Sequence, residues 1–212
     1  MKVISMNNVH SKIEAYYTNK IQVHGATPKG VDWNGEESQT LRFEQLSKII
    51  KQDEFTLADI GCGYGKYCEY LESNFQNYSY LGYDLSHEMI INAKRIFKKK
   101  DNVEFENIQN LVSIDEFDYS IASGIFSVKM QHNEAEWLSY ILETLEILNK
   151  KSKKGFSFNM LTRYSDKEYM RNDLYYADPL FFFDYCKRNF SRNISLNHDY
   201  DLYEFTILVR KD

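Results

Sequence analysis

Three glycines follow an apolar segment of this chain at alternating positions. Residues 56–60 are predicted to form a strand that runs directly into Gly61, Gly63 and Gly65. Because glycine has no Cβ, this spacing permits a tight turn and lets a ligand lie against bare backbone. A helix is predicted to begin after Gly65, and its first turn offers unpaired N–H groups. The segment therefore predicts a ligand site, with a purely structural turn as the alternative interpretation.

A carboxylate stands at the end of the next predicted strand, residues 78–83. Asp84 lies about 20 residues beyond the glycines, where a carboxylate can accept hydrogen bonds from ribose hydroxyls. A helix is predicted to follow from Ser86, so capping of that helix is the alternative role for Asp84. The glycines and Asp84 together favour a site for a cofactor that contains a ribose.

With these residues the sequence resembles the class I S-adenosylmethionine-dependent methyltransferases. The match is to D-I-G-C-G-Y-G at residues 59–65 and to L-G-Y-D at residues 81–84. The resemblance implies that S-adenosylmethionine is the cofactor. It also implies that Asp59 helps to hold the methionine part of the cofactor, commonly its amino group, and that Asp84 binds the ribose diol.

The resemblance implies further cofactor contacts near the ends of the predicted strands. These expected contacts are Gly61, Cys62, Gly63, Leu85, Asn107, Ile108 and Ser123. Asn107 and Ile108 would bracket the adenine. The family often has Asp where this chain has Asn107, whose side-chain carbonyl could accept a hydrogen bond from the adenine amino group instead.

The main alternative cofactor is a nicotinamide or flavin dinucleotide. Sites for dinucleotides usually follow the pattern G-x-G-x-x-G, whose third glycine packs the helix against the strand. In this chain the third glycine, Gly65, comes one residue earlier, and a long segment precedes the motif. The pattern therefore favours S-adenosylmethionine.

Three histidines, His132, His198 and His24, are candidate general bases, because the imidazole pKa lies near neutrality. His132 lies between the predicted fourth strand and the helix after it, and His24 lies in a glycine-rich loop. A structural role is the alternative for each. Methyl transfer from a sulfonium requires an aligned acceptor, and the acidic residues form no recognisable ligand cluster. We therefore predict a metal-independent enzyme.

The N-terminal part of the chain contains further side chains suited to recognition. Trp33 and Tyr17 could form a lid over the cofactor or the substrate. Arg42 could pair with the cofactor carboxylate, because its guanidinium binds carboxylates through two hydrogen bonds. The alternative is an amphipathic helix that packs on the sheet, with Trp33 anchoring its start.

The elements that must position these residues alternate between strands and helices. The predicted strands span residues 56–60, 78–83, 103–106, 117–122, 155–161, 193–197 and 203–210. The predicted helices span residues 11–20, 38–51, 66–73, 134–149 and 178–189, with one more that begins at Ser86. This order predicts a doubly wound α/β fold with a mostly parallel seven-stranded sheet, an antiparallel C-terminal strand and helices on both faces. Residues 1–55 would form a helical cap, and residues 56–212 the methyltransferase domain.

Composition limits the cellular setting and the partners. The net charge of -5 argues against nucleic acid as the main partner. No apolar run approaches the roughly 20 residues that a membrane helix needs, and the N-terminus lacks the apolar block of a signal peptide. The odd number of cysteines suits a reducing compartment. We therefore expect a cytoplasmic protein without a membrane partner.

The segment after the predicted fourth strand bears on the acceptor. Methyltransferases that act on exocyclic amines of DNA bases carry an Asn/Asp-Pro-Pro-Tyr/Phe motif at this point, and residues 123–126 (S-G-I-F) do not match it. This favours methyl transfer to O or N of a small molecule, including a sugar or a surface-polysaccharide precursor. Arg163 and Arg171 could hold an anionic acceptor. RNA or protein remains the alternative acceptor, and the sequence carries no signal for the oligomeric state.

Overall fold

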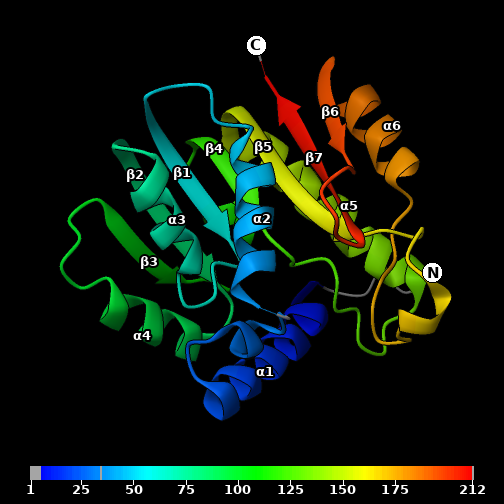
Figure 1. Cartoon of the computed structure of the whole chain (residues 1–212), viewed down its shortest axis with the longest axis horizontal. Coiled ribbons are helices and arrows are strands. Elements are labelled where there is room, and N and C mark those ends of the chain that lie inside the picture. The colour runs from blue at the N-terminus through cyan, green and yellow to red at the C-terminus, as the bar shows by residue number, and fades with distance from the viewer. Residues whose placement is uncertain (1–5, 34, 212) are drawn as a thin grey trace.

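The computed structural model describes residues 6–33 and 35–211 (Figure 1). Its seven strands are β1 (Glu54–Ile60), β2 (Asn77–Asp84), β3 (Val103–Asn107), β4 (Phe117–Ala122), β5 (Ser152–Leu161), β6 (Asn193–Asn197) and β7 (Glu204–Arg210). They form one sheet in the order β3-β2-β1-β4-β5-β7-β6. Strand β7 runs antiparallel to both of its neighbours, β5 and β6, whereas the other six strands all run in one direction. The predicted fold class and the antiparallel C-terminal strand are confirmed.

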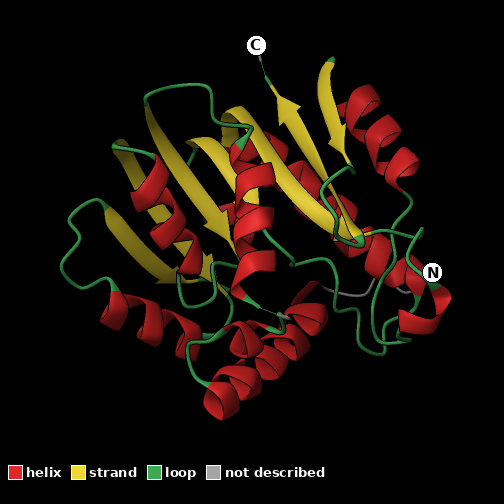
Figure 2. Cartoon of the chain, in the orientation of Figure 1, coloured by secondary structure: helices red, strands yellow, loops and turns green. Residues whose placement is uncertain are grey.

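Helices cover both faces of the sheet (Figure 2). The α-helices are α1 (Met6–His24), α2 (Glu36–Ser47), α3 (Lys66–Asn74), α4 (His87–Ile96), α5 (Glu134–Lys151) and α6 (Pro179–Asn189). The short 3-10 helices are η1 (Pro28–Val31), η2 (Leu111–Ser113) and η3 (Lys167–Tyr169). Among the described residues, no helix has the length and apolar character needed to cross a membrane.

Two apolar clusters hold these layers together, one on each face of the sheet. Helices α2, α3 and α4 pack on one face through residues such as Leu46, Leu71 and Ile90. Helices α5 and α6 pack on the other face, where Trp137 and Phe182 are fully buried. The central strands are therefore covered on both sides, as the continuous apolar runs of a parallel sheet require.

Helices α4 and α5 begin where the sequence predicts, because capping side chains fix their first turns. The Ser86 hydroxyl accepts a hydrogen bond from the Met89 N–H at the start of α4. Asn133 and Glu136 form a reciprocal capping box at the start of α5. Helix α2 ends at Ser47, earlier than the predicted residue 51, because the next N–H groups bond to carbonyls three residues back.

The carboxyl ends of the parallel strands meet at one edge of the sheet. In the register of the sheet, Ile60 at the end of β1 pairs with Tyr83 of β2 on one side and with Ala122 of β4 on the other. After β1, the chain adds β2 and β3 on one side of it and then crosses to add β4 on the other side. Ligands of such sheets bind at this reversal, outside the carboxyl ends of the strands.

Candidate active site

The glycine-rich turn after β1 is tied to the neighbouring strand. The N–H groups of Gly61 and Cys62 both donate to the Tyr83 carbonyl, at 2.8 and 3.0 Å. Gly61 has a φ of 75°, and a Cβ at this position would lie 2.3 Å from Ile125 Cγ2. Any other residue would therefore be strained here and would collide with the loop after β4.

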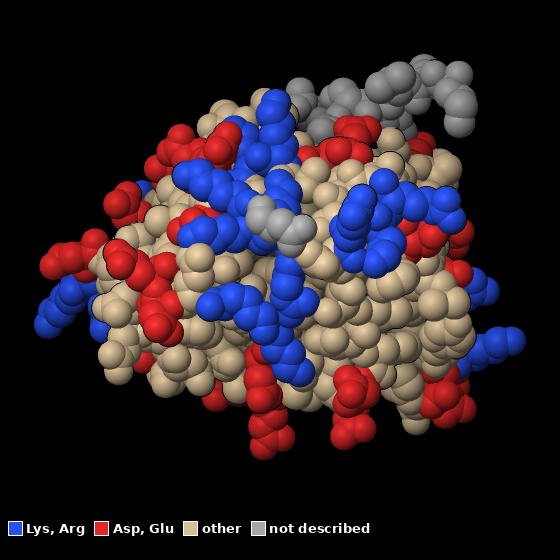
Figure 3. Space-filling view, turned by 90° about the horizontal axis from the view of Figure 1, so that it is seen from above, with Lys and Arg blue, Asp and Glu red and all other residues tan. Residues whose placement is uncertain are grey.

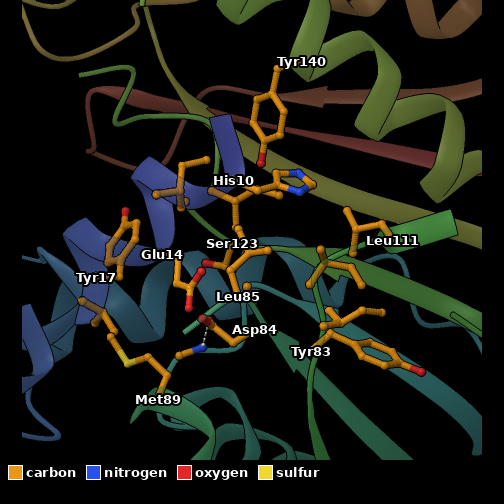
Figure 4. Close-up of a pocket in the computed structure, with 18 of the residues that line it drawn as sticks. His10, Glu14, Tyr17, Tyr83, Asp84, Leu85, Met89, Leu111, Ser123 and Tyr140 are labelled. Atoms are coloured by element: carbon orange, nitrogen blue, oxygen red, sulfur yellow. Dashed lines mark hydrogen bonds between the residues drawn. The ribbon is translucent and has the colours of Figure 1, made fainter. Parts of the chain in front are cut away.

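Asp84 joins the glycine turn to the start of α4. Its Oδ2 accepts from the Gly63 N–H at 2.9 Å, and its Oδ1 accepts from the Ser86 N–H at 2.8 Å (Figure 4). Burial raises the pKa of Asp84 to about 6, and the nearby Glu14 carboxylate adds to this effect. The glycine motif and Asp84 therefore lie side by side, and Asp84 also supports the helix as its alternative role predicted.

A cavity of about 780 Å³, here called the central cleft, opens beside this pair of motifs. Gly61, Gly63 and Asp84 line it from the ends of β1 and β2, and α1 contributes Glu14 and Tyr17 (Figure 4). Most of its lining is apolar, and the carboxylates of Asp84 and Glu14 are among its few polar groups.

A smaller cavity of about 350 Å³, the inner pocket, lies between α2 and the glycine turn. It shares Gly61, Gly63 and Ser123 with the central cleft. Asp59 lines it with only 2% of its surface exposed, and its Oδ2 accepts from the Tyr80 hydroxyl at 2.7 Å. Burial raises the pKa of Asp59 to about 7.

A third cavity of about 1170 Å³, the outer groove, adjoins the central cleft on the side of β5 and β7. The two cavities share Tyr17, Val31, Trp33 and Gly124. The Trp33 indole lies against Gly124, where a Cβ would come within 2.4 Å of the ring. These residues therefore form the boundary between the two cavities.

Most of the residues expected at the cofactor site lie together around the central cleft and the inner pocket. They are Tyr17, Trp33, Asp59, Gly61, Cys62, Gly63, Asp84, Leu85, Ile108 and Ser123. They come from α1, from the segment after η1 and from the ends of β1, β2, β3 and β4. Their roles toward the cofactor remain predictions.

Two expected cofactor contacts have other partners in the structure. The Asn107 amide donates to the backbone carbonyls of Asp84 and Leu85, at 3.0 and 2.8 Å, and does not line the central cleft. The Arg42 guanidinium is buried against Glu204, with Nε 2.9 Å from both carboxylate oxygens. Arg42 also lies 3.8 Å from the centre of the Trp33 ring and lines the outer groove. A buried carboxylate thus occupies the group expected to bind the cofactor carboxylate.

None of the three candidate bases lies at the boundary of the cavities. His132 is buried within the loop after β4, stacks on Trp137 and has its Nδ1 3.4 Å from Glu136. His24 is exposed at the last turn of α1, and His198 is exposed directly after β6. Since none of them lines the central cleft or the outer groove, the structure gives no support to a catalytic role for them.

Several site residues escaped the sequence analysis. They are His10, Glu14 and Tyr140 at the central cleft, Gln39 at the inner pocket and Glu204 at the outer groove. All but Glu204 lie on helices, away from the strand ends where the search concentrated. In the sequence, such a residue can be recognised only as a polar side chain on a helix face that is otherwise apolar. Gln39 is an example, because it lies one turn before the buried Phe43 on α2.

Taken together, the reversal of the sheet at β1, the glycine turn and its bond to Asp84 define a Rossmann-like enzyme that binds a nucleoside cofactor. The chain belongs to the class I S-adenosylmethionine-dependent methyltransferases. Residues 58–148 match the family described as "Methyltransferase domain". S-Adenosylmethionine is its cofactor, and when bound it supplies an electrophilic methyl group on sulfur.

Similar proteins support this assignment. A protein of Mycobacterium tuberculosis (strain ATCC 25618 / H37Rv) named "Putative methyltransferase Rv1506c" is 48% identical over 159 residues, which cover 75% of this chain and 95% of that protein. A malonyl-[acyl-carrier protein] O-methyltransferase of Paenibacillus sp. (strain JDR-2) is 24% identical over 170 residues, covering 74% of this chain and 56% of that protein. The solved "DhpI-SAH complex structure" has the same fold, with a TM-score of 0.65, 14% identity and 98% coverage of each chain. These similarities do not favour the dinucleotide alternative.

The raised carboxyl pKa values predict how stability and binding respond to pH. The pKa of Asp84 is about 6 in the folded protein against an ordinary value of 3.8, so the folded state binds a proton that the unfolded state releases. Charging Asp84 therefore lowers the free energy of unfolding as pH rises from about 3.8 to about 6, and the loss is complete above that range. We expect Asp84→Asn, which lacks this ionisation, to gain melting temperature relative to the unaltered protein as pH rises between about pH 4 and about pH 6.5.

The comparison isolates Asp84, because both proteins retain Asp59 and the buried His10, whose pKa burial lowers. Affinity for S-adenosylhomocysteine should instead rise with pH over the same interval. The predicted reason is that the ionised Asp84 carboxylate can accept hydrogen bonds from both ribose hydroxyls, whereas its protonated form is the weaker acceptor. Melting temperature and titration calorimetry at matched pH values measure the two effects. A constant difference in melting temperature between the two proteins would contradict the assigned pKa.

Proposed function

We propose that this enzyme transfers the methyl group to an oxygen or nitrogen of a small polar ring compound that binds in the outer groove. A sugar or a surface-polysaccharide precursor has the required chemistry. The observation that carries the proposal is the boundary formed by Trp33 and Gly124, which belongs to both the central cleft and the outer groove. An acceptor atom at this boundary would lie close to a methyl group carried in the cleft.

The lining of the outer groove supports a ring-shaped acceptor. Its aromatic side chains are Tyr17, Trp33, Tyr169, Tyr176 and Tyr203. Aromatic rings offer large apolar faces, and the tyrosine hydroxyls add hydrogen-bonding groups at their ends. A ring with polar substituents can use both kinds of contact.

The charges of the groove favour a neutral or positively charged acceptor. Arg42 pairs with Glu204, and Arg171 pairs with Asp173. Asp32 and Asp201 also line the groove. Arg163 pairs with Asp178 in the same way. Because these arginines already have carboxylate partners, we propose a neutral or positively charged acceptor in place of the anionic one that the sequence predicts.

The same lining bears on proton removal. Among the described residues, no histidine lines the outer groove, while three carboxylates do. A neutral amine attacks a methyl sulfonium without prior deprotonation, and a nearby carboxylate can then take the proton. A hydroxyl acceptor would need the carboxylate to remove its proton during attack. Asp32 is already paired with Lys20 and the Tyr16 hydroxyl, so we propose that Asp201 orients the acceptor and receives its proton.

The distribution of basic residues supports a small molecule over RNA. Lys and Arg gather on the face shown in Figure 3, at the amino ends of the parallel strands, which is opposite the central cleft. On that face Lys154 pairs with Asp118, and Arg210 donates to the Lys48 carbonyl. A phosphate backbone held there would not place a base at the cleft, because the cleft lies at the carboxyl ends of the strands.

The position of α1 supports a covering role for the N-terminal part. His10, Glu14 and Tyr17 of α1 line the central cleft, and Val31 of η1 lines all three cavities. Ile21 of α1 packs with Tyr64 and Met89 from the elements below it. We propose on this basis that residues 1–55 act as a cap on a methyltransferase domain of residues 56–212.

A turnover screen tests the proposed function. The purified protein is incubated with S-adenosylmethionine and separate acceptors, and release of S-adenosylhomocysteine is measured. Amino sugars and neutral sugars are expected to give turnover. A malonyl thioester represents anionic acceptors, and transfer RNA and a lysine-rich peptide represent macromolecules. Turnover with the thioester or a macromolecule, and none with the sugars, would overturn the proposal.

A further inference from the structure

The inner pocket contains polar atoms that the protein leaves unsatisfied. Gln39 of α2 is only 2% exposed, and its Oε1 has no hydrogen-bond partner among the described residues. The same holds for the Oγ of Ser123 at the end of β4. Both residues line the inner pocket. A buried acceptor without a donor costs stability, so a ligand that supplies donors is the physical explanation for keeping both groups.

The Tyr64 hydroxyl lies beside the Gln39 amide, and their interaction opposes the effect of burial on the Tyr64 pKa. The Gln39 carbonyl oxygen, by contrast, has no hydrogen-bond partner among the described residues. Packing alone would favour methionine or leucine here, because neither buries an unpaired carbonyl.

Three acceptors from three elements meet around the inner pocket. Asp59 ends β1, Gln39 lies on α2 and Ser123 follows β4. One oxygen of Asp59 accepts from Tyr80, and the carboxylate has a second oxygen. An ammonium group has three N–H donors, so it can satisfy one acceptor on each of these residues.

We propose that Gln39, together with Ser123, binds the ammonium group of the amino-acid tail of S-adenosylmethionine in the inner pocket. Asp59 is the position at which the resemblance to the family implies a contact with this group, and Gln39 adds a contact from a helix outside the family motifs. Lys66 lines the same pocket but is paired with Glu69 and Glu36, so it takes no part in the assignment.

The assignment predicts a selective loss of affinity. S-Adenosylhomocysteine carries the amino-acid tail, whereas 5′-methylthioadenosine has the same adenosine and thioether without it. Gln39→Met is expected to weaken S-adenosylhomocysteine about 10-fold or more, since a hydrogen bond to a charged group is lost. It should leave the affinity for 5′-methylthioadenosine unchanged. It should also raise the melting temperature of the ligand-free protein, because the unpaired carbonyl is removed.

Gln45→Met is the matched control, because Gln45 is a buried glutamine of the same helix whose Oε1 accepts from Lys48 outside the pocket. It should alter neither affinity. Ser123→Ala is the second test variant and should show the same selective loss, so the result does not depend on the folding of one protein. Equal loss of both ligands, or unchanged S-adenosylhomocysteine affinity in both variants, would overturn the assignment. Titration calorimetry gives all these affinities without methyl transfer.

Discussion

Replacing Asp84 by alanine is expected to weaken binding of S-adenosylhomocysteine about 100-fold or more, because the two hydrogen bonds that we predict from the ribose to its carboxylate would be lost. The variant also leaves the N–H groups of Gly63 and Ser86 without their acceptor, which loosens the glycine turn. Unlike Gln39→Met, this change should weaken 5′-methylthioadenosine as well, since both ligands contain the ribose. Titration calorimetry with the two ligands measures the effect.

Asp101→Ala serves as the control for Asp84→Ala, because Asp101 is exposed in the turn before β3 and lines none of the three cavities described above. It should bind both ligands like the unaltered protein. Asp84→Asn should give an intermediate loss, since its amide keeps one acceptor oxygen. If Asp84→Ala were folded by thermal unfolding and retained full affinity, the cofactor would have to bind somewhere other than the central cleft.

The largest expected loss of stability follows from Arg42→Met. Glu204 is 3% exposed, and without Arg42 its charge would have only the Asn159 amide as a hydrogen-bonding partner. Leaving one member of a buried ion pair uncompensated costs about 3–5 kcal/mol. For a protein of this size we expect the melting temperature to fall by about 10 °C. Differential scanning calorimetry measures this change.

Two further variants separate the effect of the buried charge from other effects of the substitution. Arg42→Met combined with Glu204→Gln removes both charges and should recover at least half of the lost melting temperature. Arg163→Met breaks an exposed pair with Asp178 and should cost less than about 1 kcal/mol. A single Arg42→Met protein as stable as the unaltered one would show that Glu204 is not held charged by Arg42.

The ion pair also reaches the boundary between the central cleft and the outer groove. The Asn159 amide donates to Glu204 and its Oδ1 accepts from the Gly124 N–H at 2.8 Å. The Arg42 guanidinium meanwhile lies against the Trp33 indole, which packs on Gly124. Loss of Arg42 should therefore disturb both sides of this boundary, and a red shift in the Trp33 emission would report it.

Much of the fold could be predicted because it depends on local patterns. The strand from 56 to 60 and the helix that begins at Ser86 agree with β1 and α4 to within a few residues. Apolar runs, capping residues and glycines act on neighbours in the sequence, so their effects can be read without the fold. The limits of α1 were less well predicted, because much of that helix is polar and its ends carry no strong signal.

Apart from Tyr17 and Trp33, the site residues that the sequence predicted correctly follow strands. Asp59, Gly61 and Asp84 lie at strand ends, and the order of a parallel sheet brings those ends together. Gln39 and Glu14 lie on helices whose docking on the sheet no short motif encodes. Arg42 was assigned to the cofactor because its actual partner, Glu204, is 162 residues away in the sequence.

The sequence by itself determined the class of cofactor and the strands that carry its motifs, because the glycine turn and the acidic strand end are properties of contiguous residues. The tertiary structure alone decided which side chains face the ligand cavities and which pair with each other. Burial explains the difference: a carboxylate, guanidinium or amide withdrawn from water must find a partner, and that partner is set by packing between distant segments. Arg42 therefore belongs to Glu204, and Gln39 to the inner pocket.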